Sequence, residues 1–306
     1  MKKYLLGIFG LIIAATIAWY LSVPHYRNID GFSQNANKRI ETFLKETRKI
    51  SGRKVAVFDI DGTLLGQVPY YLADEALYAY ATENQLPPEK LKIINKMQNT
   101  KDNAGIEYVS QRIEFLSGLS ADEIKSIGNK TFKEKFSDKI YPEMKQLVHN
   151  LQRYNIEVWA ITASPEFLYK LPISEHFGIP ETRIIGIKSV IHDGITTADI
   201  IRPLPQEQGK ADTIYTFIQA RPIFAAGNSR GDMEMVNESI GLKFMVNPDD
   251  NKTTDFGTGR METLKQYREN DQNCVIVRIN DTDDGRDYTM RNTNIKPNQQ
   301  EPKTGN

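Results

Sequence analysis

The chain has 306 residues, and its 39 Lys and Arg balance its 39 Asp and Glu, so the formal net charge is zero. This balance argues against a nucleic-acid partner, which usually leaves a basic excess. A composition of 40% hydrophobic and 25% charged residues is ordinary for a globular protein. The single cysteine excludes an internal disulfide, and the length allows one large domain or a core with an inserted unit.

The N-terminus carries the pattern of a membrane segment. Two lysines precede an uncharged apolar stretch at residues 4–23, whose length suits a helix that crosses a bilayer. Trp19 and Tyr20 lie near its far end, where aromatic side chains favour the membrane interface. We predict that residues 1–23 are a transmembrane anchor, with a cleaved signal peptide as the alternative. Because such lysines stay on the cytoplasmic side, we expect the rest of the chain on the extracytoplasmic side, the periplasm of a bacterium, or exported after cleavage.

The next segments predict a helix and then the first strand of a core. Residues 24–52 are interpreted as a linker and a helix, because an amphipathic pattern covers residues 36–49. The β-branched and aromatic run at residues 54–60 is typical of a central parallel strand. We assign residues 53–66, together with residues 152–280, to an α/β core.

A long helical region follows this strand. Residues 67–151 carry apolar side chains at helical spacing and contain no convincing strand pattern. Ser120 and Pro142 are signals of helix starts within it. We therefore predict a helical cap that is inserted directly after the first core strand.

Strand-like runs return in the second half of the chain, and helical segments separate several of them. Strands that alternate with helices predict a parallel sheet covered on both faces. Asp193 and Gly194 mark the turn of a hairpin. The polar tail at residues 281–306 is predicted to be disordered. The strand-like runs are residues 157–164, 183–191, 221–229, 242–248 and 273–280.

Two carboxylates end the first core strand. Asp59 and Asp61 follow an apolar run, and residues two apart in an extended chain face the same way, so both are predicted to point at one ligand. Gly62 allows a sharp exit from the strand. A plain acidic turn is the alternative for a lone Asp-x-Asp, but the apolar run before it and the Gly-Thr after it favour a site.

Three further polar groups stand near the carboxyl ends of predicted strands or at a helix start, where α/β sheets bind ligands. Thr162 offers a hydroxyl suited to an anionic oxygen, whereas Ser164 is favoured as a helix cap. Lys210 begins an amphipathic helix and is predicted to point inward. Asn228 and Asp232 lie in a loop after an apolar strand, and such oxygen ligands suit Mg²⁺.

Together these groups resemble the haloacid dehalogenase-like (HAD) phosphatase superfamily. The resemblance rests on Asp-x-Asp-Gly-Thr, a strand-end hydroxyl, a lysine and Gly-Asn-Ser-x-x-Asp, in that order, and covers residues 53–248. It implies a Rossmann-like parallel core, the HAD fold. The helical insertion resembles the type 1 cap of the phosphoserine-phosphatase-like branch.

The resemblance implies a role for each acidic residue. Asp59 is expected to be the nucleophile that forms an aspartyl-phosphate, and Asp61 the general acid and base. Mg²⁺ is expected on the Asp59 carboxylate, the backbone carbonyl of Asp61, and Asn228 or Asp232. Many relatives have Asp where this chain has Asn228, so the choice between these last two ligands stays open.

The resemblance also implies a phosphate site. Lys210 is expected to supply positive charge to the transferring group. Thr162 and the backbone N–H groups after the nucleophile, including that of Gly62, are expected to orient the phosphate oxygens.

The start of the cap suggests a class of substrate. Tyr70 and Tyr71 are predicted to stack on a cationic head group, and Asp74 or Glu75 to pair with an amine. That would suit a small phosphorylated metabolite such as phosphocholine, phosphoethanolamine or phosphoserine. In the alternative, the tyrosines pack within the cap and the acids face water.

These features predict a Mg²⁺-dependent phosphomonoester hydrolase. Two alternatives on the same fold are a membrane-tethered phosphotransferase, which passes the phosphoryl group to an alcohol, and a catalytically silent binding module. Asp61 favours hydrolysis, because the similar transport ATPases carry Thr at this position.

Overall fold

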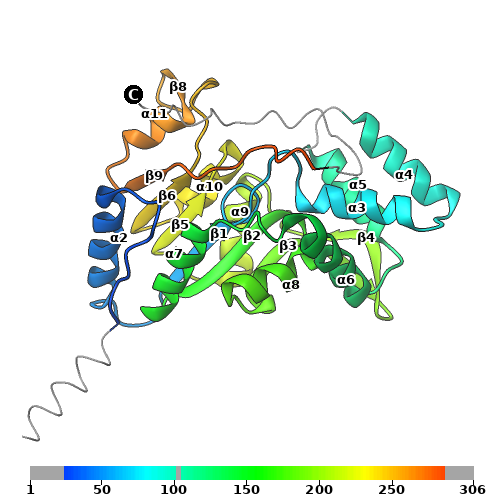
Figure 1. Cartoon of the computed structure of the whole chain (residues 1–306), viewed down its shortest axis with the longest axis horizontal. Coiled ribbons are helices and arrows are strands. Elements are labelled where there is room, and N and C mark those ends of the chain that lie inside the picture. Colours follow the sequence, from blue (N-terminus) through cyan, green and yellow to red (C-terminus); the bar gives the residue numbers. More distant parts are fainter. Residues whose placement is uncertain (1–23, 101–104, 287–306) are drawn as a thin grey trace, which may run out of the picture.

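The computed structural model of the chain describes residues 24–100 and 105–286 (Figure 1). The predicted membrane segment at residues 1–23 lies outside these ranges, as do residues 287–306 of the predicted tail. Within the described ranges, no helix combines the length and the apolar character that a membrane span needs.

A seven-stranded sheet forms the centre of the molecule, with the strand order β4-β3-β2-β1-β5-β6-β9. Every strand runs parallel to its neighbours except the edge strand β4, which is antiparallel to β3. The predicted α/β sheet is therefore confirmed, and so is the hairpin, whose turn at Asp193–Gly194 joins β3 to β4. The strands are β1 (Val55–Asp59), β2 (Glu157–Pro165), β3 (Ile184–His192), β4 (Ile195–Ile201), β5 (Phe224–Gly227), β6 (Leu242–Val246) and β9 (Cys274–Val277).

Helices cover both faces of the sheet, which explains why β1 is apolar from Val55 to Phe58. Ala56 and Phe58 point into one core, shared with α2, α7 and α8. Val55 and Val57 point into the other, shared with η3, α10 and α11. Successive side chains of a strand face opposite sides, so a strand buried on both needs apolar residues at each position. The helices are α2 (Gln34–Thr47), α7 (Pro142–Arg153), α8 (Glu166–Phe177), α9 (Gln208–Thr213), η3 (Ile214–Ile218), α10 (Met233–Asn237) and α11 (Leu264–Glu269).

The cap consists of the helices between β1 and α7, which gather at one end of the sheet (Figure 1). Ser120 caps α6 through a capping box with Glu123, as its position predicts. Pro142 begins α7 as predicted, but α7 packs against β2 and α8, so the chain has already returned to the core there. The predicted cap range of 67–151 therefore extends too far. The cap elements are α3 (Leu72–Glu83), α4 (Pro88–Asn99), α5 (Ile106–Leu116), α6 (Ala121–Thr131) and η1 (Phe132–Phe136).

The two segments that join the cap to the core lie side by side. The N–H of Gly66 donates to the carbonyl of Lys139 at 2.8 Å, and the N–H of Tyr141 donates to the carbonyl of Leu64 at 3.1 Å. These backbone hydrogen bonds form a narrow hinge between cap and core.

The first residues of the predicted disordered tail bind to this hinge. Asp281 is buried, and its carboxylate accepts the N–H groups of Gln67 at 3.0 Å and Val68 at 3.4 Å. Asp284 pairs with Lys139 at 3.0 Å. The prediction of disorder is therefore wrong for the described part of the tail. Its polar composition gave no sign of a buried carboxylate with two backbone donors.

Replacing Asp281 with Ala should lower the free energy of unfolding by about 1–3 kcal/mol, because two backbone donors lose their buried acceptor. Urea denaturation measures this change. Asp283→Ala is the control, since Asp283 is exposed and its carboxylate accepts the N–H of Gly285 within its own turn. This control should change stability by less than about 0.5 kcal/mol. Equal losses in both variants would contradict the role given to Asp281.

Candidate active site

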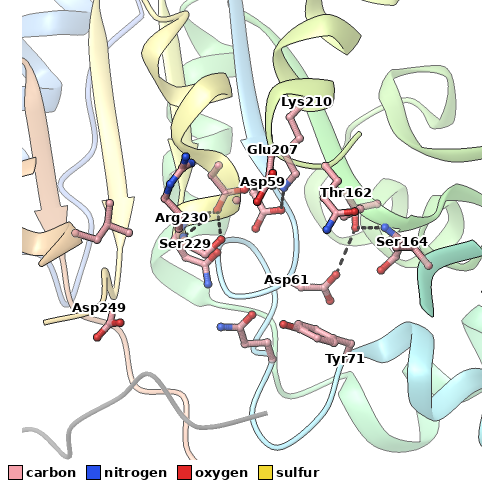
Figure 2. Close-up of a pocket in the computed structure, with 18 of the residues that line it drawn as sticks. Asp59, Asp61, Tyr71, Thr162, Ser164, Glu207, Lys210, Ser229, Arg230 and Asp249 are labelled. Atoms are coloured by element: carbon pink, nitrogen blue, oxygen red, sulfur yellow. Dashed lines mark hydrogen bonds and ion pairs between the residues drawn. The ribbon is translucent and has the colours of Figure 1, made fainter. Parts of the chain in front are cut away.

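The carboxyl ends of the neighbouring strands β2, β1 and β5 lie next to one another. The chain leaves β1 for β2, β3 and β4 on one side and returns to β5 on the other side of β1. Their carboxyl ends therefore meet at a switch point, where open α/β sheets bind ligands. A cavity of about 470 Å³ opens there (Figure 2). It is lined by the predicted residues Asp59, Asp61, Thr162, Lys210, Asn228 and Asp232, together with residues from the cap.

Asp59 is held at the end of β1 by two donors. Its Oδ1 accepts from Lys210 Nζ at 2.5 Å, and its Oδ2 accepts from the hydroxyl of Thr63 at 3.0 Å. Lys210 also contacts Oδ1 of Asp232 at 2.6 Å. All four side chains are buried, so a single ammonium group bridges two carboxylates away from water.

Burial and the neighbouring charges shift the pKa of each ionisable group in this cluster. Burial and the nearby Asp232 raise the pKa of Asp59 to about 7, although Lys210 opposes the shift. Burial also works against the charge of Lys210, but Asp232 and Asp59 outweigh it and raise the pKa of this lysine. Asp232 keeps a pKa below its ordinary value despite burial, because Lys210 and backbone N–H groups stabilise its charge. Asp59 is therefore the carboxylate of this cluster that takes up a proton most readily, whereas Asp232 keeps its negative charge.

Asp61 lies on the side of the cavity that faces Thr162 (Figure 2). Its Oδ1 accepts from the hydroxyl of Tyr169 at 2.9 Å, and its Oδ2 accepts from the hydroxyl of Thr162 at 3.4 Å. Burial raises the pKa of Asp61 to about 6, while Tyr169 and Arg112 act in the opposite direction. The two carboxylates that the sequence paired therefore have different neighbours: an ammonium group at Asp59, and hydroxyl groups at Asp61.

Asp232 organises the loop after β5. Its Oδ2 accepts from the N–H of Asn228 at 3.0 Å and from the N–H and hydroxyl of Ser229 at 2.9 and 3.0 Å. With Oδ1 on Lys210, both oxygens of Asp232 have protein partners. Asp232 thus fixes the position of Asn228 at the cavity wall.

The donors present fit a magnesium ion. Asp59, Asp61 and Asp232 bring three carboxylates into the cavity, and Lys210 is in contact with two of them. Hard oxygen ligands and surplus negative charge are what Mg²⁺ requires. Across residues 24–100 and 105–286, no three His, Cys, Asp or Glu side chains form a metal cluster by themselves. A magnesium ion held here would therefore need further oxygen ligands, such as the amide oxygen of Asn228 and a backbone carbonyl.

Gly62 makes the predicted turn after β1 and also leaves room for a neighbouring side chain. Its φ of +83° confirms that it makes the sharp exit from β1. Its N–H donates to the carbonyl of Leu65 at 2.6 Å, so this N–H is bound within the turn. A Cβ at this position would lie 2.0 Å from Nδ2 of Asn228. Glycine therefore keeps room for the Asn228 side chain.

Ser164 was expected to cap a helix, and that expectation is wrong. β2 continues to Pro165, which is the N-cap residue of α8 and makes no side-chain cap. Ser164 instead lines the cavity, and its Oγ lies 3.4 Å from Nη1 of Arg112.

Two tyrosines and two acids were predicted to bind a cationic head group. Tyr71 lines the cavity, but its ring lies against the guanidinium of Arg112, 5.9 Å from ring centroid to Cζ. Tyr70 is buried in the hydrophobic core and does not line the cavity. Both acids are already paired, Asp74 with Arg112 at 2.7 Å and Glu75 with Lys135. The acids therefore neither face water nor stand ready for an amine.

The sequence interpretation missed several residues that shape the site. Arg112 comes from the amphipathic cap helix α5 and Tyr169 from the core helix α8, and neither residue belongs to a motif. A small hairpin, β7 (Thr253–Asp255) with β8 (Met261–Thr263), brings Thr254 and Phe256 to the cavity. Gly257 and Gly259 signal this turn in the sequence, but each strand has 3 residues, too few for an alternating pattern of polar and apolar side chains to be recognised.

A comparison with family models assigns the class. The model of haloacid dehalogenase-like hydrolases matches residues 56–237, which include all the predicted catalytic, phosphate and metal residues. The chain belongs to this family.

Individual relatives are distant. The chain is 25% identical over 208 residues to the hydrolase ML2424 of Mycobacterium leprae, covering 63% of this chain and 66% of that protein. It is 24% identical over 208 residues to phosphoserine phosphatase SerB1 of Mycobacterium tuberculosis, covering 63% and 65%. The chain thus spans slightly less than two thirds of the length of the curated relatives it matches. A solved structure from Anaerococcus prevotii, described as a conserved protein of unknown function, shares the fold with a TM-score of 0.63 at 14% identity, covering 82% of this chain and 94% of that one.

The raised pKa of Asp61 predicts a pH-dependent cost in stability. The unfolded chain ionises this group near its ordinary value of 3.8, whereas the folded protein resists ionisation up to about 6. Stability contributed by Asp61 therefore falls as pH rises between these values and stays low above them. In metal-free buffer, Asp61→Asn should be more stable than the wild type at pH 8, by on the order of 2–3 kcal/mol.

The same urea titration at pH 4 should show a much smaller difference, since Asp61 is then largely protonated in both states. Asp122→Asn is the matched control, because Asp122 is an exposed carboxylate in the first turn of α6. A gain from Asp61→Asn that is equal at the two pH values would rule out this explanation.

Proposed function

We propose that this chain is a Mg²⁺-dependent phosphomonoester hydrolase in which Asp59 takes up the phosphoryl group of a small phosphorylated substrate. The observation that carries the proposal is the buried contact of Asp59 with Lys210, in a cavity that also contains Asp61. Membership of a hydrolase family supports the reaction class. The name of the Mycobacterium tuberculosis relative supports a phosphomonoester as substrate.

In the first step, a carboxylate oxygen of Asp59 attacks phosphorus, and the bond from phosphorus to the leaving oxygen breaks. Asp61 gives its proton to that oxygen, so the alcohol leaves neutral. Lys210 and Thr162 bind the phosphate oxygens as charge shifts during transfer. Thr63 keeps Asp59 in place, because its hydroxyl is bound to the other carboxylate oxygen.

In the second step, the ionised Asp61 removes a proton from a water molecule that attacks the aspartyl-phosphate. Inorganic phosphate leaves, and Asp59 is free again. Asp61 must therefore start protonated and Asp59 ionised. Mg²⁺ held by Asp59, the backbone carbonyl of Asp61, and Asn228 or Asp232 would supply the positive charge that favours an ionised Asp59.

The substrate is proposed to be small, because a cavity of about 470 Å³ is at the lower end of the range for ligand sites. Its leaving group would lie near Tyr71 and Arg112, two of the cap residues at the cavity. Among phosphoserine, phosphocholine and phosphoethanolamine, the paired state of Asp74 and Glu75 removes the acids that we assigned to a bare amine. Phosphoserine is the first compound to test, because a relative from Mycobacterium tuberculosis is named as a phosphoserine phosphatase.

We also propose an extracytoplasmic location. The basic and then apolar pattern of residues 1–23 supports membrane anchoring, or export if the segment is cleaved. Fractionation of cells that express the full chain, followed by protease treatment from outside, tests the location separately from the activity.

Asp59→Asn should abolish hydrolysis, with a loss of at least about 1,000-fold in kcat, because an amide cannot form the covalent intermediate. The assay measures phosphate release from phosphoserine and from 4-nitrophenyl phosphate. Asp122→Asn, which changes the same atoms at an exposed site in α6, should keep wild-type activity. Substantial turnover by Asp59→Asn would refute the nucleophile assignment. An inactive wild type would instead favour a binding module, and phosphorylated products with added alcohols would favour a phosphotransferase.

Chelation should stop the reaction and Mg²⁺ should restore it, because the carboxylates of the cavity need a cation to offset their charge. Activity in EDTA followed by a Mg²⁺ titration measures this requirement. Full activity in EDTA-treated, metal-free protein would remove the ion from the scheme.

A further inference from the structure

Tyr169 joins the cap to one of the two carboxylates of the site. It lies in α8 of the core and is fully buried. Its hydroxyl donates to Oδ1 of Asp61 at 2.9 Å and accepts the backbone N–H of Ala73 at 3.2 Å. Oγ of Ser164 is 3.5 Å away, at the limit of a hydrogen bond. One phenol oxygen therefore contacts both a cap helix and Asp61.

The contact with Ala73 has a clear physical origin. Ala73 lies in the first turn of α3, where N–H groups have no acceptor within the helix. Tyr71, the N-cap residue, provides no side-chain cap. The Tyr169 hydroxyl takes this place from outside the helix, so the start of α3 is attached to the core at this oxygen.

The single hydrogen of a phenol makes the arrangement directional. Tyr169 accepts from Ala73 with a lone pair and has one proton to give, which lies toward Asp61 at the shorter distance. Burial raises the pKa of Tyr169 well above its ordinary value, so the phenol keeps that proton. If α3 moved away, the oxygen would lose the donor that helps to orient it.

A second cap element reaches the same place. Arg112 of α5 is buried, pairs with Asp74 of α3, and lies 3.4 Å from Ser164 Oγ. The cap thus meets the core beside Asp61 through both α3 and α5. The cap thus contacts two core side chains beside Asp61, Tyr169 through Ala73 and Ser164 through Arg112.

We propose that Tyr169 is a positioning residue that directs Asp61 at the leaving group when α3 is seated on the core, and so couples cap seating to proton donation. This inference rests on the role of Asp61 in the proposed function. Tyr169 itself does not line the cavity, so it acts through Asp61.

The test compares two leaving groups in Tyr169→Phe. Departure of the serine alkoxide needs a proton, whereas 4-nitrophenolate leaves without one. Because kcat/KM covers only the steps up to departure of the leaving group, it isolates proton donation from hydrolysis of the intermediate. Tyr169→Phe should lower kcat/KM for phosphoserine by about 10- to 100-fold, and for 4-nitrophenyl phosphate by less than about 3-fold.

Tyr154→Phe is the matched control, since Tyr154 is a buried tyrosine whose hydroxyl is bound to Arg48 in the core. It should leave both kcat/KM values unchanged. In an Asp61→Asn background, Tyr169→Phe should cause no further loss for phosphoserine, because the two residues act as one unit. A loss that is equal for both substrates, or that persists in full without Asp61, would overturn the proposal.

Ala73→Pro gives a second route if Tyr169→Phe does not fold. It removes the N–H that the phenol accepts, at a first-turn position where proline is tolerated, and leaves Tyr169 in place. The same selective loss for phosphoserine is expected, and unchanged selectivity would contradict the coupling. Failure of the proposed function is recognised separately, as an inactive wild type or an active Asp59→Asn.

Discussion

The site depends on one buried ammonium group between two buried carboxylates. Removing charges from water is costly unless they are paired, and Lys210 pairs with both Asp59 and Asp232. These three side chains come from β1, α9 and the loop after β5, so the contact exists only when the sheet has its proper strand order. The strand order is therefore a condition for the site, because Lys210 can compensate the charges of Asp59 and Asp232 only when the elements that carry them lie next to one another.

The different neighbours of the two aspartates are consistent with two chemical roles. Asp59 has a positively charged ammonium group beside it, whereas Asp61 accepts hydrogen bonds from the hydroxyl groups of Tyr169 and Thr162. Two aspartates that are two residues apart thus differ in the groups that pack around them. Among the described residues, the side chains bonded to Asp59 come from the core, whereas the cap contacts Tyr169 and Ser164 beside Asp61.

Residues fixed by the strand ends were predictable from the sequence. Asp59, Thr162 and Asp232 follow apolar runs, and parallel strands bring such positions together whatever the details of packing. Tyr169 and Tyr70 show the limit. Each sits in a helical or turn segment whose pattern says that it is buried, but not which distant group it meets. The prediction of disorder in the tail failed for the same reason, because burial of Asp281 depends on the backbone N–H groups of Gln67 and Val68, which are far away in the sequence.

That last contact has a consequence for how the protein matures. The N–H groups of Gln67 and Val68 are made 214 and 213 residues before the carboxylate that accepts them. Synthesis runs from the N-terminus, and early segments fold first. The joint between cap and core is therefore completed only after Asp281 has left the ribosome, so products that end before Asp281 contain β1 with an unsecured joint.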